Sequence, residues 1–432
     1  MAPRILIVGA GFAGYHAARR LARRLPGAGL TVLNPTDYFL YLPLLPEVTG
    51  GAMEPRQVTI PLADTLPGVR MVLGEATGLD PAARQVAYRD PEGRDGHLTY
   101  DRLLLTVGSV NKLLPIPGVA DNAHGFRGLP EALYLRDHII GQVELAATTA
   151  DPAERQARLT FVVVGAGYTG TEVTAQGQLL SRQVAAGHPA LHGIAPRWLL
   201  LDHGDRILAH LDRRLSEAAT ATLRGRGVDI RTGTSVSEAT ADGVHLDDGS
   251  FIAGRTLVWC VGVRPDPLVD NVGLPTQQGR LTVDAFLTVP GHREISACGD
   301  AAAVPDLTRP GKLTAMTAQH AQRQGVRAAD NIAADFGRGR RRAYRHHSLG
   351  FAVDLGGTRA AANPLGVPLT GLPAYAVTRG YHLAALPANR LRVAAAWLLS
   401  AGHHRPDTRL GLVPGSAVPL DTAEPEAGHA RS

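Results

Sequence analysis

The sequence predicts an α/β protein with two similar domains, because one strand–glycine turn–helix pattern occurs twice. An apolar run at 4–8 leads into GAGFAG at 9–14, and a second run at 161–164 leads into GAGYTG at 165–170. A GxGxxG turn between a buried strand and a helix is typical of dinucleotide binding. The chain is therefore expected to contain two Rossmann-like dinucleotide-binding domains.

Each glycine of the first turn has an expected task. Gly9 allows a tight turn, Gly11 lets the backbone approach a pyrophosphate, and Gly14 lets the helix pack closely on the strand. The start of the helix then faces the phosphates. In the second turn the same tasks fall to Gly165, Gly167 and Gly170.

An acidic residue is expected about twenty residues after each turn, where it binds a ribose. The first domain has Asn34 there, which departs from the usual carboxylate but can still form hydrogen bonds. The second domain has Asp202, which favours NADH, whereas Arg206 nearby could accommodate NADPH.

Several further segments end in small or polar residues that could contact a cofactor. The aromatic and proline-rich stretch 38–46 could form a wall of a flavin site, and an acid behind a glycine at 299–300 suits the flavin polyol. The cofactor-binding candidates from these segments are Pro43, Leu44, Thr106, Gly108, Gly262, Gly299 and Asp300. Ala318 and Gln319 lie on a helix that is only amphipathic by its own spacing, and they become cofactor-binding candidates through the family resemblance given below.

Length and composition fit a globular protein of two to three domains. The 432 residues are 44% hydrophobic and 19% charged, with a net charge of +5 and a pI near 9.4. The two cysteines form no CxxC, and no cluster has metal-ligand spacing, so neither a dithiol centre nor a metal site is expected. Residues 1–115 and 281–335 are predicted to form the first dinucleotide-binding domain and 116–280 the second.

The remaining segments are predicted to form a C-terminal β/helical region, 336–402, and a disordered tail, 403–432. Two amphipathic helices are expected between 373 and 404, broken at Pro387. The second carries an apolar stripe at Leu391, Ala394, Ala395 and Leu398, widened by Trp397 and Leu399. This stripe suits either docking on an anionic membrane surface or packing on the protein itself or in a homodimer.

The expected location is cytoplasmic, either soluble or peripheral on the inner face of the cell membrane. No signal peptide precedes the first strand, and no run of about twenty apolar residues could span a bilayer. The basic run at 338–347 lacks any nucleic-acid-binding pattern beside it, so no nucleic acid partner is expected.

Together these motifs resemble type II NADH dehydrogenases, single-subunit NADH:quinone oxidoreductases within the two-dinucleotide-binding-domain flavoproteins. The stretches that carry the resemblance are 38–48, 165–172, 259–263, 298–300 and 318–321, and it continues through 374–397. It implies FAD in the first domain, NADH in the second and a quinone that reaches the flavin from the membrane side. It also implies that Glu172, as the catalytic residue, lies near the nicotinamide, and that Gln319, Gln322 and Arg323 border the quinone site. Arg323 stands where the family usually has glutamine.

The function predicted from this resemblance is hydride transfer from NADH to FAD, followed by two-electron transfer to a quinone without proton pumping. The first alternative is an NAD(P)H reductase or biosynthetic tailoring enzyme with a non-quinone acceptor, which the arginine at position 323 favours. The second is a non-catalytic flavoprotein that senses NADH. The rate of NADH oxidation with different electron acceptors distinguishes these three functions.

Overall fold

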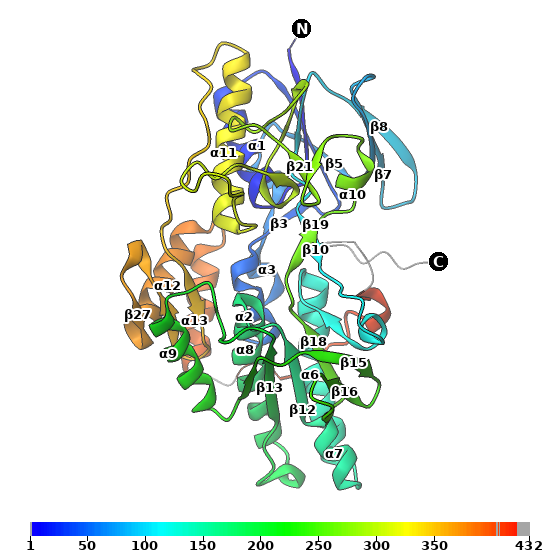
Figure 1. The fold of residues 1–432 in the computed structure, drawn as a ribbon, viewed down its shortest axis with the longest axis vertical. Helices are drawn as coiled ribbons and strands as arrows, with labels where there is room; N and C mark the ends of the chain where they lie inside the picture. Colours follow the sequence, from blue (N-terminus) through cyan, green and yellow to red (C-terminus); the bar gives the residue numbers. More distant parts are fainter. Residues whose placement is uncertain (1, 403–404, 406, 421–432) are drawn as a thin grey trace.

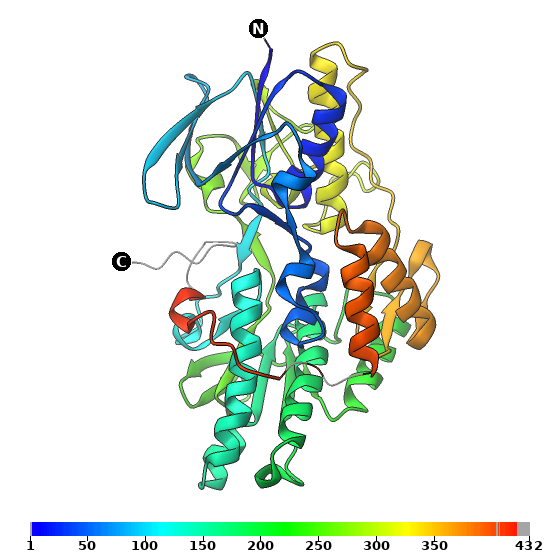
Figure 2. The same cartoon turned by 180° about the vertical axis from the view of Figure 1, so that it is seen from behind.

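The chain forms two main β-sheets, each made mostly of parallel strands. The two sheets lie one above the other along the long axis of the molecule (Figures 1 and 2). The structure is a computed structural model, and it describes residues 2–402, 405 and 407–420. A smaller C-terminal module packs against the side of both domains. The predicted α/β fold with two dinucleotide-binding domains is confirmed.

The first domain is built around a six-stranded sheet whose central strand is the buried run before the first glycine turn. In sheet order the strands are β22 (Thr288–Val289), β23 (His292–Ala297), β9 (Arg102–Leu105), β1 (Arg4–Val8), β2 (Gly29–Asn34) and β5 (Arg70–Leu73). β1 pairs in parallel with both β2 and β9. The carboxyl end of β1, where the turn begins, therefore lies in the middle of the sheet.

Helices α1 (Phe12–Arg24) and α11 (Ala318–Asp335) lie side by side against this sheet (Figures 1 and 2). They approach closely because Gly325 has no side chain: a Cβ there would lie 2.1 Å from the carbonyl oxygen of Ala13. The other helices formed by this part of the sequence are α2 (Leu45–Thr49), α3 (Pro55–Val58), α4 (Leu62–Thr65) and α10 (Leu268–Asn271). Of these, α2 packs against two helices of the second domain.

Small antiparallel sheets complete the first domain. They contain β3 (Tyr38–Leu40) with β4 (Thr59–Pro61), β6 (Glu75–Asp80) with β7 (Gln85–Arg89) and β8 (Asp95–Thr99), and β20 (Thr276–Gln277) with β21 (Arg280–Thr282) and β24 (Ala302–Ala303). β5 lies outside these small sheets, because it pairs in parallel with β2 as the edge of the main sheet.

The second domain repeats the pattern with a five-stranded parallel sheet. In sheet order its strands are β11 (His124–Gly125), β18 (Thr256–Trp259), β12 (Thr160–Val164), β13 (Arg197–Asp202) and β14 (Asp229–Thr232). A meander of β15 (Val236–Thr240), β16 (Gly243–Leu246) and β17 (Phe251–Ala253) completes its β structure. The helices are α5 (Val119–Asn122), α6 (Leu129–Thr148), α7 (Pro152–Arg158), α8 (Tyr168–Ala186) and α9 (Arg213–Arg224).

The chain crosses between the domains through two antiparallel strands, β10 (Ser109–Asn111) and β19 (Val263–Pro265). After β19 the chain is already back in the first domain, since α10 contacts β6. The return therefore comes earlier than the boundary expected at residue 281. The chain returns directly after β19, because β19 pairs with β10, which is far from it in sequence.

The C-terminal module consists of β25 (Ala352–Asp354), β26 (Ala360–Ala362) and β27 (Leu369–Thr370), followed by α12 (Gly371–Ala385) and α13 (Arg390–Gly402). The two predicted helices are therefore present, separated around Pro387. No helix within the described ranges is long and apolar enough to cross a bilayer.

Residues 407–420, which we expected to be part of a disordered tail, run back along the second domain (Figure 2). The Asp137 carboxylate on α6 accepts hydrogen bonds from the backbone N–H groups of Leu410 and Gly411, at 3.1 and 2.6 Å. Leu420 is 3% exposed in the apolar core beside β11. We call residues 405 and 407–420 the C-terminal strap; residues 403–404, 406 and 421–432 of the predicted tail lie outside the described residues.

Candidate functional site

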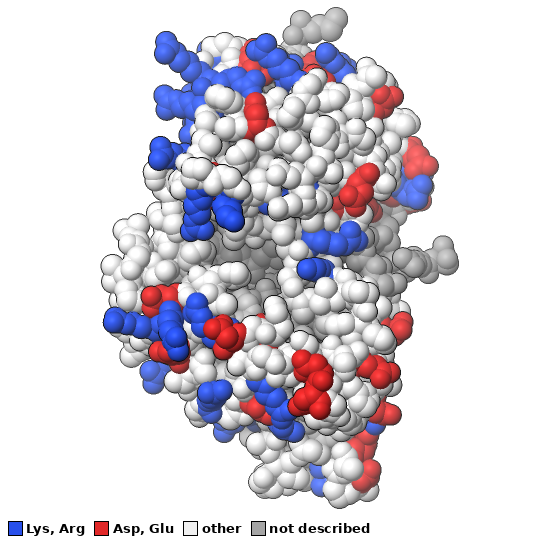
Figure 3. All heavy atoms as spheres, in the orientation of Figure 1, with Lys and Arg blue, Asp and Glu red and all other residues white. Residues whose placement is uncertain are grey.

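A cavity of about 470 Å³ lies where the first domain, the start of α8 and the C-terminal module meet. The residues predicted from the sequence that line it are Gly9, Gly11, Asn34, Pro43, Thr106, Gly108, Glu172, Gly299, Asp300, Ala318, Gln319 and Gln322. In the space-filling view the molecule is hollowed at its waist, and most atoms around the hollow are uncharged (Figure 3). The structure thus brings candidates from all parts of the chain to one place.

The two glycine turns have the same geometry. A Cβ at Gly14 would lie 1.8 Å from the carbonyl oxygen of Gly9, whereas a Cβ at Gly11 would meet nothing within 4 Å. In the second turn, Gly170 shows the same 1.8 Å approach and Gly167 the same open space. The middle glycine of each turn therefore leaves the backbone open to a ligand, and the last one permits close packing of the helix.

Asn34 uses both ends of its amide within the protein. Its Oδ1 accepts a hydrogen bond of 2.7 Å from the backbone N–H of Ala10, in the first glycine turn. Its Nδ2 donates to the carbonyl oxygen of Thr36 at 2.9 Å, and the side chain is only 5% exposed. Asn34 therefore fixes the turn from the end of β2.

Asp202 holds the second turn in the same way. Its Oδ2 accepts from the backbone N–H of Ala166 at 2.5 Å, and its Oδ1 accepts from that of Gly204 at 2.7 Å. The guanidinium of Arg206, on the same loop, donates instead to two backbone carbonyl oxygens of the segment that follows, at 3.0 and 2.7 Å.

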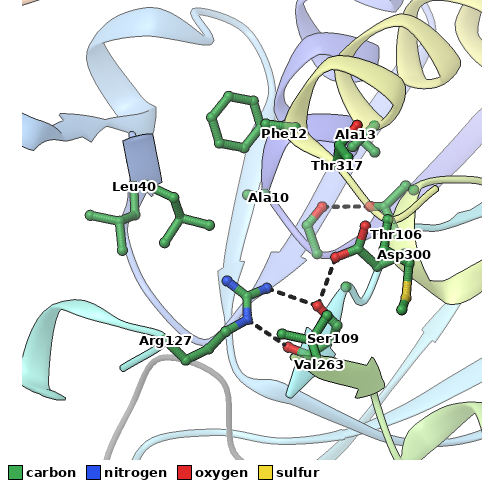
Figure 4. A pocket seen from close by; sticks show the side chains of 18 of the residues that line it. Ala10, Phe12, Ala13, Leu40, Thr106, Ser109, Arg127, Val263, Asp300 and Thr317 are labelled. Atoms are coloured by element: carbon green, nitrogen blue, oxygen red, sulfur yellow. Dashed lines mark hydrogen bonds between the residues drawn. The ribbon is translucent and has the colours of Figure 1, made fainter. Parts of the chain in front are cut away.

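On the cavity wall, a hydrogen-bonded chain links Arg127, Ser109 and Asp300 (Figure 4). Arg127 donates to Ser109 through Nη2 to Oγ at 3.1 Å and through Nε to the carbonyl oxygen at 3.2 Å. Ser109 Oγ donates in turn to Asp300 Oδ2 at 2.7 Å. The sequence analysis missed Arg127, since it stands alone before α6 and no motif marks it.

The start of α11 meets the cavity with one face only. Gln319 Nε2 donates to the carbonyl oxygen of Gly350 at 2.7 Å, and Gln322 also lines the cavity. Arg323, which we expected to face the acceptor, is outside the described cavity lining. Its guanidinium donates to the carbonyl oxygen of His347 and lies 3.3 Å from His346 Nδ1, because the helical rotation places it on another face of α11.

Other candidates also lie outside this cavity. Leu44 is 1% exposed and belongs to the apolar core rather than the wall, although its neighbour Pro43 lines the cavity. Gly14 serves helix packing, as described above. Candidates of the second domain that are not part of this lining are Gly165, Gly167, Gly170, Asp202 and Gly262.

Glu172 lies on the first turns of α8 and faces the cavity. Its Oε1 accepts a hydrogen bond of 2.9 Å from the backbone N–H of Asp354, in the C-terminal module. Burial raises the pKa of Glu172 well above its usual range, and the nearby carboxylates of Asp354 and Glu47 act in the same direction. The geometry therefore favours a protonated carboxyl group at this position.

Behind Glu172, Arg379 of α12 joins two buried carboxylates. It forms ion pairs with Glu47 of α2 and with Asp354, the latter at 2.9 Å. Trp397 Nε1 of α13 donates to the second oxygen of Glu47 at 2.7 Å, and the Arg379 guanidinium lies 4.2 Å from the Trp397 ring centroid. Burial raises the pKa of Glu47 to about 7, against the opposing effect of Arg379.

Cys260 and Cys298 form no disulfide. Burial raises the pKa of the Cys260 thiol to about 12, so it is protonated at neutral pH. Among the described residues, no group of three or more His, Cys, Asp or Glu side chains could hold a metal ion.

Comparisons with known proteins agree with this architecture. The pyridine nucleotide-disulphide oxidoreductase family matches residues 3–325. The chain is 30% identical to a demethylphylloquinone reductase of Synechocystis sp. over 92% of this chain and 96% of that one. It is also 30% identical to a type II NADH:quinone oxidoreductase of Mycobacterium tuberculosis over 92% and 87%.

Among solved structures, the NDH2 of Plasmodium falciparum, determined with NADH, superposes with a TM-score of 0.86. The two chains are 17% identical, and the match covers 94% of this chain and all of that one. This likeness shows the fold, and the family match together with the sequence relatives identifies the family. The chain belongs to the type II NADH:quinone oxidoreductases, FAD- and NAD(H)-binding flavoenzymes within the pyridine nucleotide-disulphide oxidoreductases.

Proposed function

We propose that this chain oxidises NADH and passes two electrons to a quinone through an FAD held in the cavity. The observation that carries the proposal is that one cavity is lined by the first glycine turn, by the start of α8 from the second domain and by the C-terminal module. FAD, when bound, supplies the hydride acceptor and the electron donor for the quinone. The protein residues bind and orient the reactants.

The cavity wall fits an FAD molecule at several points. The open space at Gly11, beside the N-terminus of α1, suits a pyrophosphate. Asp300 is held by Ser109 and can accept hydrogen bonds from the hydroxyl groups of a polyol, while Arg127 adds a positive charge to the same wall. Asn34 holds the turn instead of a ribose, because both ends of its amide are already engaged.

The second turn suits NADH better than NADPH. Asp202 stands at the ribose position, where its negative charge repels a 2′-phosphate. Arg206 could otherwise neutralise the charge of that phosphate, but its guanidinium already donates hydrogen bonds to backbone carbonyl oxygens. This arrangement supports the preference for NADH that the strand-end acid predicts.

Glu172 is proposed to act beside the nicotinamide. Its Oε1 is fixed by the Asp354 N–H, so the other carboxyl oxygen can hold or release a proton at the cavity. Burial raises the pKa of this carboxyl group and so favours its protonated form.

The C-terminal helices support docking on a membrane surface. Leu391, Leu398 and Leu399 on α13 are 87, 77 and 61% exposed, and Leu372 at the start of α12 is 62% exposed. Solvent-exposed leucines at this density on short amphipathic helices are typical of peripheral membrane contact. Trp397, which we expected to widen the stripe, instead faces inward to Glu47.

A steady-state screen tests the proposed function. Purified holoprotein should oxidise NADH rapidly with menaquinone or ubiquinone analogues and more slowly with NADPH. Fast turnover with a soluble acceptor alone would favour a tailoring or reductase role. Flavin bleaching without turnover on any acceptor would favour an NADH sensor.

A further inference from the structure

A tyrosine and a histidine that the sequence analysis did not single out are paired on the cavity wall. Tyr41 comes from the loop after β3 and His382 from α12, 341 positions later in the chain. The Tyr41 hydroxyl lies 3.1 Å from His382 Nδ1, and the ring planes are nearly perpendicular. Both side chains line the cavity, although they are only 2 and 8% exposed.

The protonation of this pair follows from its surroundings. Burial, with the positive charge of Arg379 one turn away, lowers the pKa of His382 to about 3, so the imidazole is neutral. Burial raises the pKa of Tyr41 far above its usual value, so the phenol keeps its proton. A neutral imidazole carries one N–H, at either Nδ1 or Nε2.

The hydrogen bond decides between the two tautomers. Tyr41 O–H has no other hydrogen-bond partner in the described part of the chain, and a buried hydroxyl proton without an acceptor is unfavourable. The hydroxyl therefore donates to Nδ1, which places the histidine proton on Nε2. Nε2 in turn forms no hydrogen bond with any described residue.

The surrounding wall indicates what would accept this bond. The lining that His382 shares includes apolar and aromatic side chains, among them Leu42, Leu45 and Phe351. Phe351 and Tyr381 are 37 and 38% exposed, so the cavity approaches solvent on the side of the C-terminal module. A flat apolar molecule with a carbonyl oxygen fits such a wall, because His382 Nε2–H is a buried donor that no described residue uses.

We infer that His382 Nε2–H donates a hydrogen bond to a carbonyl oxygen of the acceptor, and that Tyr41 is the positioning residue that fixes the required tautomer. The inference rests on the proposed function, since it assigns a contact within the quinone site. It also assigns selectivity: acceptors with a carbonyl group benefit from the donor, whereas outer-sphere oxidants do not.

The test compares His382→Phe, His382→Gln and Tyr41→Phe in the FAD-loaded enzyme. His382→Phe should raise both the KM and the calorimetric Kd for a short-chain quinone about tenfold, the loss of one hydrogen bond. His382→Gln, which retains an N–H donor, should recover part of this loss. Turnover with ferricyanide should fall much less than turnover with the quinone.

Tyr41→Phe should weaken quinone binding less than His382→Phe and should change the tautomer. In histidine-labelled protein, the ¹⁵N shifts of the His382 ring should show an Nε2–H imidazole in the wild type and a mixture in Tyr41→Phe. Tyr375→Phe is the matched control, because it removes a hydroxyl from α12 at a residue outside the described cavity lining.

Three outcomes overturn the inference. Unchanged quinone affinity in His382→Phe means that no bond to the acceptor exists. Equal losses with quinone and ferricyanide mean a structural role. A shifted flavin reduction potential with unchanged quinone affinity means that the donor serves the flavin. Wild-type protein that turns over with ferricyanide but with no quinone refutes the proposed function separately.

Discussion

Asn34 and Asp202 occupy equivalent positions, each at the end of the second strand of its domain. Each accepts a hydrogen bond from the N–H of the alanine in its glycine turn, at 2.7 and 2.5 Å. Holding the turn therefore needs an oxygen acceptor but no charge. The charge of Asp202 remains available for selecting the nucleotide.

The comparison with Asn34 predicts the behaviour of Asp202→Asn. The variant should keep its fold, because the amide oxygen can still accept the hydrogen bond from the Ala166 N–H, although the amide nitrogen cannot accept the one from the Gly204 N–H. Its KM for NADH should rise about tenfold or more, since a hydrogen bond to a charged group contributes about 1.5–3 kcal/mol. The kcat/KM ratio of NADH to NADPH should fall.

Asp205→Asn, an exposed change on the same loop, is the control for this experiment. It should leave the nucleotide preference unchanged. A wild-type protein that already prefers NADPH would contradict this interpretation of Asp202.

Glu172→Gln should alter the pH dependence of stability. The folded-state pKa of Glu172 is raised above the unfolded value of about 4.3, so the folded protein binds more protons. This carboxyl group therefore destabilises the wild type progressively as pH rises from that unfolded value towards the raised one. The variant lacks this loss, and its stability relative to the wild type should increase by up to about 1.4 kcal/mol per pH unit.

Denaturant unfolding from pH 4.5 to pH 8, followed by tryptophan fluorescence, measures this difference. Glu217→Gln, at an exposed site on α9, should show no such trend. A difference between Glu172→Gln and wild type that stays constant over this range would show that Glu172 is ionised in the folded protein.

At the scale of elements, α12 and α13 are attached to the first domain through buried charges. Arg379→Met would leave the carboxylates of Glu47 and Asp354 without their cation. Breaking a buried pair in this way costs about 3–5 kcal/mol. Thermal and denaturant unfolding at pH 7 should show that loss, and Glu47→Gln in the same chain should restore part of it.

Arg392→Met serves as the comparison, because Arg392 lies on the exposed face of α13. This substitution should change the free energy of unfolding by no more than about 0.5 kcal/mol. A similarly small effect of Arg379→Met would mean that the two carboxyl groups are neutral in the folded protein.

The exposed face of α13 leads to a separate prediction about membranes. Replacing Leu391 and Leu398 together by glutamate should release the protein from anionic liposomes at low salt, because charge opposes burial in the headgroup region. Bound FAD, measured by absorbance, should remain, since both side chains point to solvent. Leu145→Glu on α6, at a side chain 46% exposed, should not release it.

Co-sedimentation of the wild-type protein with anionic liposomes is the decisive test of this membrane contact. If it does not co-sediment with anionic liposomes at low salt, the face instead contacts another protein or a second copy of the chain.

For the whole molecule, the C-terminal strap connects the end of α13 to the second domain. Arg405 donates to the carbonyl oxygen of Gly50 and to Gln176 Oε1, at 2.8 and 2.9 Å, and Leu420 packs beside β11. The strap thus joins residues of both domains. Its order depends on a few identifiable contacts.

Asp137→Ala should loosen the strap, because it removes the acceptor of the Leu410 and Gly411 N–H groups. Trypsin should then cleave after Arg409 at least tenfold faster in otherwise folded protein, consistent with hydrogen bonds to a charged group of about 1.5–3 kcal/mol. Mass spectrometry of timed digests measures the rate. An unchanged rate would mean that apolar contacts such as Leu420 hold the strap.

Features that arise from neighbouring residues could be predicted from the sequence alone. Each strand–glycine turn–helix unit was predictable, since the tight turn, the open middle glycine and the close helix approach depend on short-range sterics. The helices α12 and α13 were predictable from apolar spacing and an interrupting proline. The family resemblance rests on the same local motifs.

Which side chains face the cavity could not be predicted from the sequence, because it depends on how distant elements pack together. Whether Arg323 or Gln322 meets it depends on how α11 is rotated against α1, and Trp397 faces inward because Glu47 and Arg379 lie there. The pair of Tyr41 and His382 joins opposite parts of the chain. Such contacts depend on the packing of whole domains against one another, and local sequence patterns do not encode that packing.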